Sequence, residues 1–565
     1  MVRLVITVLL AASATGAPKS IVELQPFRTT DSAPIRIAGK EGTATLVNLN
    51  PSSNSWYLYS VVWNNGAAEQ PWHLENPAPR EATLVLDRRN AGTLIIKSGG
   101  KQDSCGLFSG ASTLQQGRES RLIYYPLCGG RVYLRNPAKG QRTALEASAE
   151  FLRNQVWGGE KIIVFFHHLM ADRYRETAAV QGRAESPVKD AAQGGPLPAL
   201  MNAARAQRIA IPEGLGVRLQ MESTAGKSMD PGTWYPAADK PGVRVSVMQP
   251  SLIQPGILDS FPRLVTKLDT VEAASLVYLI AFELDQFDIG FARGTEYPGV
   301  GWSDRVLPQV RDARLPGPDG IGNIAPLVAT GLIPPADGKR TVAAFTGGFK
   351  RTHGAFRYGD LATVHQGSHY GFVENGVVFS RLQPGLATMV VRDNGRLEMK
   401  TWSEADNGSL AGIRHARQNG VPLVETDASR ATVPGALVSK WGPGNWSGSE
   451  DARLRTIRAG AAIHESHGKR YLIYAVFSSA TPAAMARVFH AYQCSYAMLL
   501  DMNALEHTYL AVYRRSGSEM SVDHLIKGMS QLDKSAAGQI VPRFLGYPDN
   551  RDFFYVMSRR PEVQR

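Results

Sequence analysis

Cysteine is scarce in this chain, and long hydrophobic runs are absent. Only three of the 565 residues are cysteine, which excludes a small scaffold held together by disulfides. Beyond the first residues no apolar run approaches the roughly 18 residues that a membrane-spanning helix needs. Internal repeats, low-complexity blocks and the ligand spacing of zinc sites are also missing from the sequence. We therefore expect a soluble globular protein with no metal site, no cofactor and no transmembrane segment beyond an N-terminal signal.

The first residues have the pattern of an export signal. Arg3 supplies a positive charge, Leu4 to Ala11 form an apolar run, and Ala12-Ser13-Ala14 is a small-residue cleavage site. We expect a signal peptide at residues 1–14, with a retained anchor as the alternative. The mature protein is then expected to be secreted or periplasmic.

The cysteines fit an exported protein with one disulfide. Cys105 and Cys128 lie in one glycine-rich region and are the plausible pair, and their bridge would contribute roughly 3 kcal/mol through loop closure. Cys494 has no neighbouring cysteine or basic cluster, so we expect a buried thiol there and not a nucleophile.

The charge of the chain is positive. A formal net charge of +12 suits anionic partners such as a phosphorylated glycan or a cell-envelope polymer. Nucleic acid is disfavoured because the chain carries an export signal and lacks a basic recognition motif. The simpler alternative is a solvated basic surface without a partner.

The pattern along the chain predicts an α+β protein of several domains, because 565 residues are too many for one core. Short runs of β-branched and aromatic residues between turn dipeptides predict strands in the N-terminal part. The expected regions are a β-sandwich-like domain at 20–140, a helical connector at 141–180, a linker or crossover at 181–241, a mixed-sheet domain at 242–520, and a C-terminal helix and tail at 521–565.

Two predicted strands of the C-terminal domain end in polar residues. One strand runs to Leu500 and is followed by Asp501, Asn503, Glu506 and His507. It closes a β-α-β unit whose helix begins with an N-cap threonine and a proline. The other strand ends in the turn Thr346-Gly347-Gly348-Phe349. We expect the two ends to face one cleft, as strand ends do in open α/β sheets.

Each polar group has a chemical interpretation. Gly347 and Gly348 would let backbone N–H groups approach a ligand oxygen. His353 follows in the same region and is a further candidate binding residue. Arg455, in a cluster with Arg453 and Arg458, would recognise phosphate, although a solvated basic loop is the alternative. Arg414 and Arg417 form a lesser polar cluster.

The acidic cluster offers carboxylates and an imidazole within seven residues. Reaction at an anomeric carbon needs a carboxylate near the developing positive charge and an acid or base beside it. The candidate catalytic residues are therefore Asp501, Glu506 and His507, with Asn503 as a binding residue. A calcium site at Asp501 and Asn503 is a rival, but the further ligands of an EF-hand are missing.

Together these features resemble the phosphodiester glycosidase family, to which N-acetylglucosamine-1-phosphodiester α-N-acetylglucosaminidase belongs. Thr346-Gly347-Gly348-Phe349-Lys350 is similar to the family's Asn-Gly-Gly-Phe-Phe turn. Arg455-Thr456-Ile457 followed by Gly460 loosely resembles an Arg-Thr-Ala-Ile-Gly segment. Leu500-Asp501 resembles the start of a late Leu-Asp-Gly-Gly-Gly-Ser motif. The resemblance covers about residues 242 to 515, and the last motif diverges, because Met502 to His507 stand where the family has glycines and a serine.

The resemblance implies cleavage of a sugar from a sugar-1-phosphodiester or a related phosphorylated glycan. The leaving phosphate has a second pKa near 6 and needs little proton assistance, but it needs a cation, which Arg455 or a neighbour would supply. Asp501 would stabilise the anomeric carbon or activate water, with Glu506 or His507 as its partner.

Two alternatives remain at the level of the sequence. The chain would be a non-catalytic, envelope glycan-binding protein if the altered loop after Asp501 has lost its chemistry and kept a pocket. It would be a different hydrolase if Glu506 and His507 act on a metal or a water molecule.

Overall fold

The computed structural model describes residues 20–144, 146–148, 151, 173–183, 195–205, 207–221, 228–296, 309, 324–348, 370–440, 453–517 and 519–559. The expected signal peptide, Phe349, His353 and most of the helical connector lie outside these residues. The protein is mainly β, with 43% strand and 14% helix, so the α+β expectation needs correction. Among the described helices the longest α-helix is α8, Pro482–Ala491, because most apolar runs are short, β-branched and bounded by turns.

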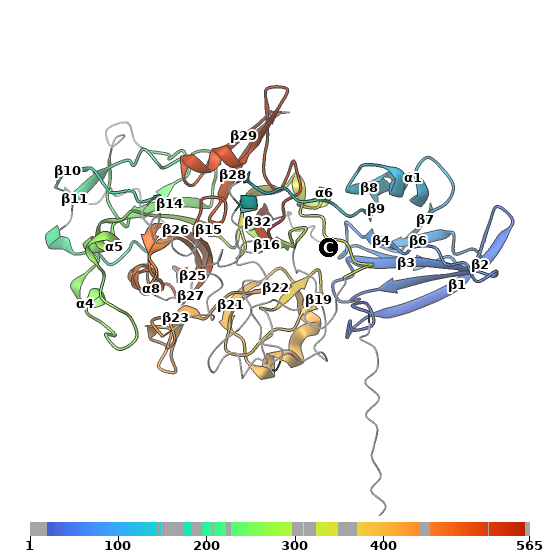
Figure 1. Ribbon diagram of the computed structural model, residues 1–565, viewed down its shortest axis with the longest axis horizontal. Helices are drawn as coiled ribbons and strands as arrows, with labels where there is room; N and C mark the ends of the chain where they lie inside the picture. The colour runs from blue at the N-terminus through green and yellow to red at the C-terminus, as the bar shows by residue number, and fades with distance from the viewer. Residues whose placement is uncertain are drawn as a thin grey trace, which may run out of the picture.

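The N-terminal part contains two antiparallel sheets, drawn in blue at one side of the molecule in Figure 1. Their buried side chains, among them Tyr59, Leu84 and Ile96, form one core. Cys105 and Cys128 form the predicted disulfide, with 5.6 Å between their Cα atoms. The first sheet has the order β1 (Thr29–Ile37), β2 (Lys40–Asn48), β3 (Trp56–Trp63), β4 (Trp72–Glu75), β9 (Val132–Arg135), β8 (Tyr124–Leu127), and the second β5 (Ala82–Leu86), β6 (Thr93–Ser98), β7 (Lys101–Gly106).

An eight-stranded antiparallel sheet carries the strand that ends near Asp501. Its order is β13 (Tyr235–Pro236), β14 (Val243–Met248), β15 (Val277–Glu283), β26 (Lys469–Ala480), β25 (Thr456–Ser466), β27 (Tyr496–Met502), β23 (Pro422–Thr426), β24 (Thr432–Pro434). Helix α8 connects β26 to β27, and the Thr481 side chain caps it by accepting from the backbone N–H of Ala484. Because β25 is antiparallel to both β26 and β27, these two strands run parallel with β25 between them.

A five-stranded antiparallel sheet carries the strand that ends in the tandem glycines. Its order is β16 (Phe287–Ala292), β32 (Phe553–Ser558), β17 (Thr341–Thr346), β28 (Leu510–Ser516), β29 (Glu519–His524). Phe345 of β17 packs on Tyr474 of β26, with ring centroids 4.8 Å apart, and on Phe554 of β32 at 5.5 Å. The two large sheets therefore share a core, and the expected meeting of β17 and β27 depends on this packing.

A third antiparallel sheet has the order β19 (Val377–Ser380), β18 (Phe372–Glu374), β22 (Ile413–Gln418), β20 (Ala387–Arg392), β21 (Leu397–Thr401). The region expected as a linker contains the three-stranded sheet β10 (Val180–Arg183), β11 (Gln207–Ala210), β12 (Ser228–Met229). The remaining short elements are α1 (Leu114–Glu119), α4 (Pro255–Leu258), α5 (Thr270–Ala274), α6 (Pro335–Gly338), and the 3-10 turns η1 (Cys128–Gly130), η2 (Ala203–Arg205), η3 (Pro250–Leu252), η7 (Glu404–Gly412).

The C-terminal segment differs from the expected helix and tail. It continues β29, forms the 3-10 turn η8 (Lys527–Leu532) and the hairpin β30 (Lys534–Ala536) and β31 (Gln539–Val541), and ends in β32. The sequence Phe553 to Met557 is apolar throughout, and all five side chains are buried. The two edges of β32 pair with β16 and with β17. A continuous apolar run of this length is a central strand, and it completes the sheet that holds the tandem glycines.

Within the described part of the chain, no helix is long and apolar enough to cross a membrane.

Candidate functional site

The two predicted polar strand ends contact each other. The Thr346 hydroxyl, at the end of β17, donates to the backbone carbonyl of His507 at 2.7 Å. The backbone N–H of Thr346 donates to the carbonyl of Tyr509 at 3.1 Å. The turn that begins with Gly347 therefore lies against the loop that follows Asp501, although the two strands belong to different sheets.

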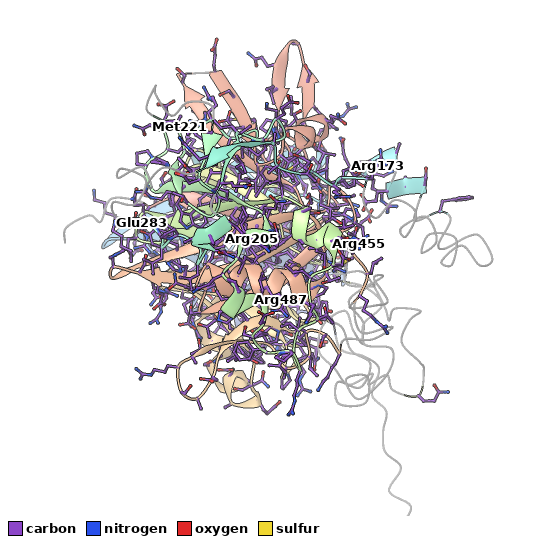
Figure 2. All side chains as sticks on the ribbon, turned by 90° about the vertical axis from the view of Figure 1, so that its left-hand side faces the viewer. Arg173, Arg205, Met221, Glu283, Arg455 and Arg487 are labelled. Atoms are coloured by element: carbon purple, nitrogen blue, oxygen red, sulfur yellow. A yellow bond between two sulfur atoms is a disulfide. The ribbon has the colours of Figure 1, made fainter. Side chains whose placement is uncertain are left out.

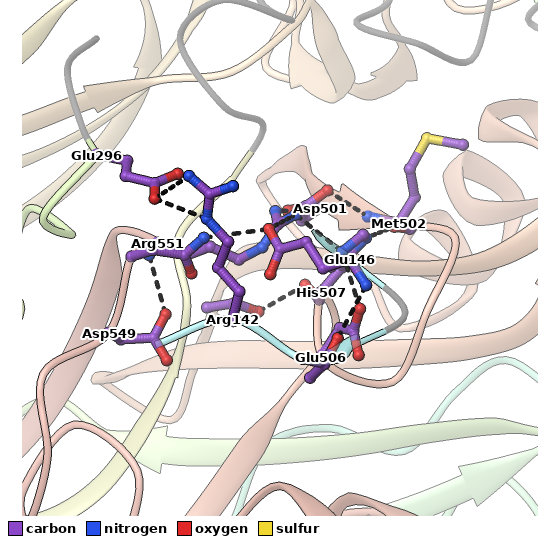
Figure 3. A network of polar contacts seen from close by, with 12 residues as sticks. Arg142, Glu146, Glu296, Asp501, Met502, Glu506, His507, Asp549 and Arg551 are labelled. Carbon is purple, nitrogen blue, oxygen red and sulfur yellow. Dashed lines mark hydrogen bonds and ion pairs between the residues drawn. The ribbon is translucent and has the colours of Figure 1, made fainter. Parts of the chain in front are cut away.

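Asp501 is buried in a polar cluster, with 4% of its surface exposed. One carboxylate oxygen accepts from the Arg551 guanidinium at 2.5 Å, and the other accepts from the backbone N–H of Met502 at 2.8 Å (Figure 3). Burial raises the pKa of Asp501 to about 7, although the positive charge of Arg551 acts in the opposite direction. A carboxyl group with this pKa can take up or release a proton near neutral pH.

Arg551 is the centre of the cluster. Besides Asp501, its guanidinium contacts Oε1 of Glu146 and Nε2 of His507, both at 2.8 Å. The other ring nitrogen of His507, Nδ1, lies 2.7 Å from the Met502 carbonyl oxygen, which can only accept. The arrangement therefore fits a neutral imidazole that donates from Nδ1 and accepts from Arg551 at Nε2.

Glu506 lies at the edge of this cluster. Its Oε1 is 3.6 Å from Nε2 of His507, and the two side chains are 11% and 18% exposed. Burial raises the pKa of Glu506, and a hydrogen bond with the Thr143 side chain partly offsets this effect. The three candidate catalytic residues, Asp501, Glu506 and His507, are thus grouped around Arg551, and His507 is the most exposed of them.

A second arginine fixes the backbone of this region. Arg543 forms an ion pair with Asp549 at 2.6 Å and donates to the Glu506 carbonyl at 2.8 Å. Asp549 also accepts from the backbone N–H of Arg551 at 2.9 Å. Arg543 therefore holds the Arg551 segment and the loop after Asp501 in one arrangement.

The tandem glycines border a buried ion pair between Arg417 and Asp552, which are 2.5 Å apart. A Cβ at Gly347 would lie 3.0 Å from the Asp552 carboxylate, and one at Gly348 would lie 3.0 Å from the Arg417 guanidinium. The backbone N–H of Gly347 donates to the Asp552 carbonyl at 2.9 Å. The glycines thus permit a close approach of charged side chains, and the N–H of Gly347 is engaged within the protein.

Asn503 has the backbone conformation of a glycine, with a φ of 80°. Asparagine is among the few other residues that adopt this region readily. The side chain of Met502 is directed to β25, where its sulfur lies 3.1 Å from the Arg458 guanidinium. The loop therefore follows a glycine-like path although the glycines of the resembled motif are absent. The Asn503 Oδ1 atom is buried and has no hydrogen-bond partner among the described residues.

The expected arginine cluster is engaged elsewhere. Arg455, which is labelled in Figure 2, forms an ion pair with Asp269, the N-cap residue of α5. Arg458 is fully buried and donates to the carbonyls of Ala480 and Leu454. The guanidinium groups at Asp501 and at Gly348 come instead from Arg551 and Arg417.

Sequence reasoning missed Arg551, Asp552 and Glu146, although the first two left a signal. The polar run Asp549-Asn550-Arg551-Asp552 stands directly before the apolar strand β32, as Asp501 to His507 stand after another. Glu146 carried no comparable signal. Within the described residues, no group of three or more histidine, cysteine, aspartate or glutamate side chains is arranged to hold a metal ion.

Comparison with known proteins finds no matching family model and no matching curated protein. The catalytic domain of zebrafish N-acetylglucosamine-1-phosphodiester α-N-acetylglucosaminidase, auto-inhibited by its pro-peptide, matches 57% of this chain and 85% of that chain, at 11% identity and a TM-score of 0.26. A hypothetical protein from Synechocystis matches 94% of this chain and 99% of that chain, at 10% identity and a TM-score of 0.22. A Burkholderia pseudomallei protein described as exported matches 50% of this chain and 74% of that chain, at 12% identity and a TM-score of 0.15. Similarity at this level assigns the chain neither a family nor an activity.

Proposed function

We propose that the protein is an exported hydrolase that cleaves a sugar from a sugar-1-phosphodiester or a related phosphorylated glycan. The observation that carries the proposal is the ion pair of buried Asp501 with Arg551 at 2.5 Å, beside a glycine turn that borders the Arg417–Asp552 pair. The resemblance of the motifs around Gly347 and Asp501 points to the same class of reaction.

The proposed chemistry needs few groups. The anomeric C–O bond breaks, the sugar carbon becomes positive, and the phosphate leaves as a phosphomonoester. Asp501 would stabilise the positive carbon or activate the attacking water, and its pKa of about 7 suits proton transfer near neutral pH. Arg551 takes the role that the sequence suggested for Arg455, because it lies at the carboxylate and can balance the charge of the leaving phosphate.

The contacts of His507 and Gly347 change the roles that the sequence suggested for them. His507 is partly exposed at the edge of the cluster, but its Nε2 already accepts from Arg551, so it can take a proton only where a substrate or a water molecule displaces that hydrogen bond. The N–H of Gly347 already donates to Asp552, so we do not assign it to substrate phosphate. Glu506 remains a candidate partner base.

The proposed location is outside the cytoplasm, in the periplasm or the medium. The Cys105–Cys128 disulfide supports it, because disulfides persist in oxidising compartments. The net charge of +12 suits a phosphorylated glycan or an envelope polymer as the partner.

A non-catalytic glycan-binding protein is the second candidate. It is favoured by the pairing within the cluster, where Asp501, Asp549 and Asp552 each lie in an ion pair with an arginine. A network with its charges paired in this way can be retained for stability alone.

The experiment is turnover of a panel of UDP-sugars and sugar-1-phosphodiesters by the wild type, Asp501→Asn and the control Arg455→Gln. We expect release of sugar by the wild type, a loss of at least about 100-fold in Asp501→Asn, and near wild-type rates in the control. Equal rates in Asp501→Asn and the wild type would remove Asp501 from the mechanism. Binding without turnover, unchanged by Asp501→Asn, would favour the second candidate.

A further inference from the structure

The segment that leaves the N-terminal sheets lies against the residues that lead into Arg551. The backbone N–H of Gly140 donates to the Thr295 hydroxyl at 2.8 Å, and that of Gln141 donates to the Pro548 carbonyl at 3.1 Å. A Cβ at Gly140 would lie 2.5 Å from the backbone nitrogen of Asn550. A side chain at position 140 would therefore force the two backbones apart, and glycine permits their contact.

This segment brings Glu146 into the cluster. Glu146 is 7% exposed, and its Oε1 accepts from Arg551 at 2.8 Å (Figure 3). The same oxygen accepts from the Asn550 side chain at 3.2 Å. Thr143, three residues earlier, contributes the side-chain hydrogen bond to Glu506. The segment thus contacts the central arginine of the candidate site through Glu146 and one of the site's carboxylate groups, Glu506, through Thr143.

Glu146 and Asp501 bind different nitrogens of one guanidinium. Arg551 Nη1 donates to Asp501, and Nη2 donates to Glu146. The charges that face Asp501 are Arg551, which favours its ionised form, and Asp552 and Glu146, which oppose ionisation. The hydroxyl of Tyr474 on β26 is also within electrostatic range, and the His507 imidazole contacts the same guanidinium at Nη2.

We propose that Glu146 is a positioning residue of the candidate site and the partner carboxylate of Asp501, acting through their shared arginine. Glu146 holds one edge of the guanidinium, so the other edge stays directed at Asp501. Its negative charge also keeps Asp501 protonated at higher pH than Arg551 alone would allow. The catalytic consequence rests on the proposed function, but the electrostatic coupling does not.

The test follows the protonation of Asp501 directly. The full chain is labelled with ¹³C at the aspartate carboxyl carbon, and the Asp501 signal is identified by its loss in Asp501→Asn. Its titration is compared in the wild type, Glu146→Gln, Glu146→Asp and Arg142→Gln. Arg142 is the matched control, because it anchors the same segment through an ion pair with Glu296 and its side chain is 40% exposed.

In Glu146→Gln we expect the titration midpoint of Asp501 to move to lower pH, by on the order of one unit. Glu146→Asp is expected to restore most of the wild-type midpoint, and Arg142→Gln to leave it unchanged. If Glu146 only packs the segment in place, Glu146→Gln and Arg142→Gln will give the wild-type midpoint, and the proposal is overturned.

The result is separable from the proposed function. A shifted midpoint in a protein that turns over no sugar-1-phosphodiester supports the coupling and counts against the hydrolase. Turnover by the wild type with an unshifted midpoint supports the hydrolase and overturns the role of Glu146. If the wild type turns over substrate, the pH dependence of its rate should contain an apparent pKa that belongs to Asp501. That apparent pKa should shift in Glu146→Gln in the same direction as the titration midpoint.

Discussion

The pH dependence of folding stability gives a direct test of how Asp501 is held. Two effects compete at this carboxyl group, since burial favours the neutral form and the ion pair with Arg551 favours the charged form. The replacement Asp501→Asn removes the titration and keeps the size of the side chain. The difference in stability between the wild type and this variant therefore isolates the carboxyl group.

The sign follows from the direction of the shift. The pKa of Asp501 is raised from 3.8 to about 7, so folding takes up a proton between these values. The wild type should lose stability relative to Asp501→Asn as the pH rises from about 4 to about 7, and the difference should be constant above that. At about 1.4 kcal/mol per pKa unit, the loss is at most about 4 kcal/mol.

The assay is the midpoint of thermal unfolding for both proteins between pH 4 and pH 8.5, at constant ionic strength. We expect the unfolding midpoint of Asp501→Asn to rise relative to that of the wild type as the pH increases. A difference that stays constant above about pH 5, or a wild type that becomes more stable relative to the variant only at the acid end of the range, would show that the pKa of Asp501 is not raised in the folded protein. That result would refute the assignment of Asp501 as a group that exchanges protons near neutral pH.

Three further predictions concern residues around the site and the disulfide. Asn503→Gly should leave stability unchanged or raise it by about 0.5 kcal/mol, whereas Asn503→Val should lower it by more than about 1 kcal/mol, because the φ of 80° is strained for a branched residue; urea unfolding checks both. Arg417→Met should lower the free energy of unfolding by about 3 to 5 kcal/mol, because Asp552 would keep a buried charge without its partner. The double variant Arg417→Met with Asp552→Leu should lose less stability in the same urea assay, and equal losses would contradict a buried ion pair. Replacing Cys105 and Cys128 by serine should lower stability by roughly 3 kcal/mol, and an unchanged unfolding midpoint would contradict the loop-closure argument.

Part of the site could be predicted from the sequence because its signals are local. An apolar run followed by Asp501 marks the end of a buried strand, and the tandem glycines after Phe345 mark another. The N-cap at Thr481 and the disulfide are local signals of the same kind. These features depend on residues that are neighbours in the chain or share one short region.

The partners of these residues could not be predicted in the same way. Arg551 contacts Asp501 across 50 residues of sequence and Glu146 across 405. Such contacts depend on how two sheets pack and on where a segment crosses them, and neither is encoded in a local pattern. Arg455 is a residue that the sequence wrongly favoured for the site. It pairs with Asp269, and its neighbour Arg458 donates to the backbone carbonyl of Ala480.

Sheet direction explains why half of the site was missed. The sequence reasoning searched for polar residues after strands, which is where chemistry gathers in parallel sheets. In an antiparallel pair, the residues after one strand lie beside the residues before its partner. Thr346 at the end of β17 pairs with Phe553 at the start of β32, so the tandem glycines lie beside Arg551 and Asp552. Because the strands within each sheet of the described residues pair antiparallel, the polar residues that precede a buried strand should be searched together with those that follow one.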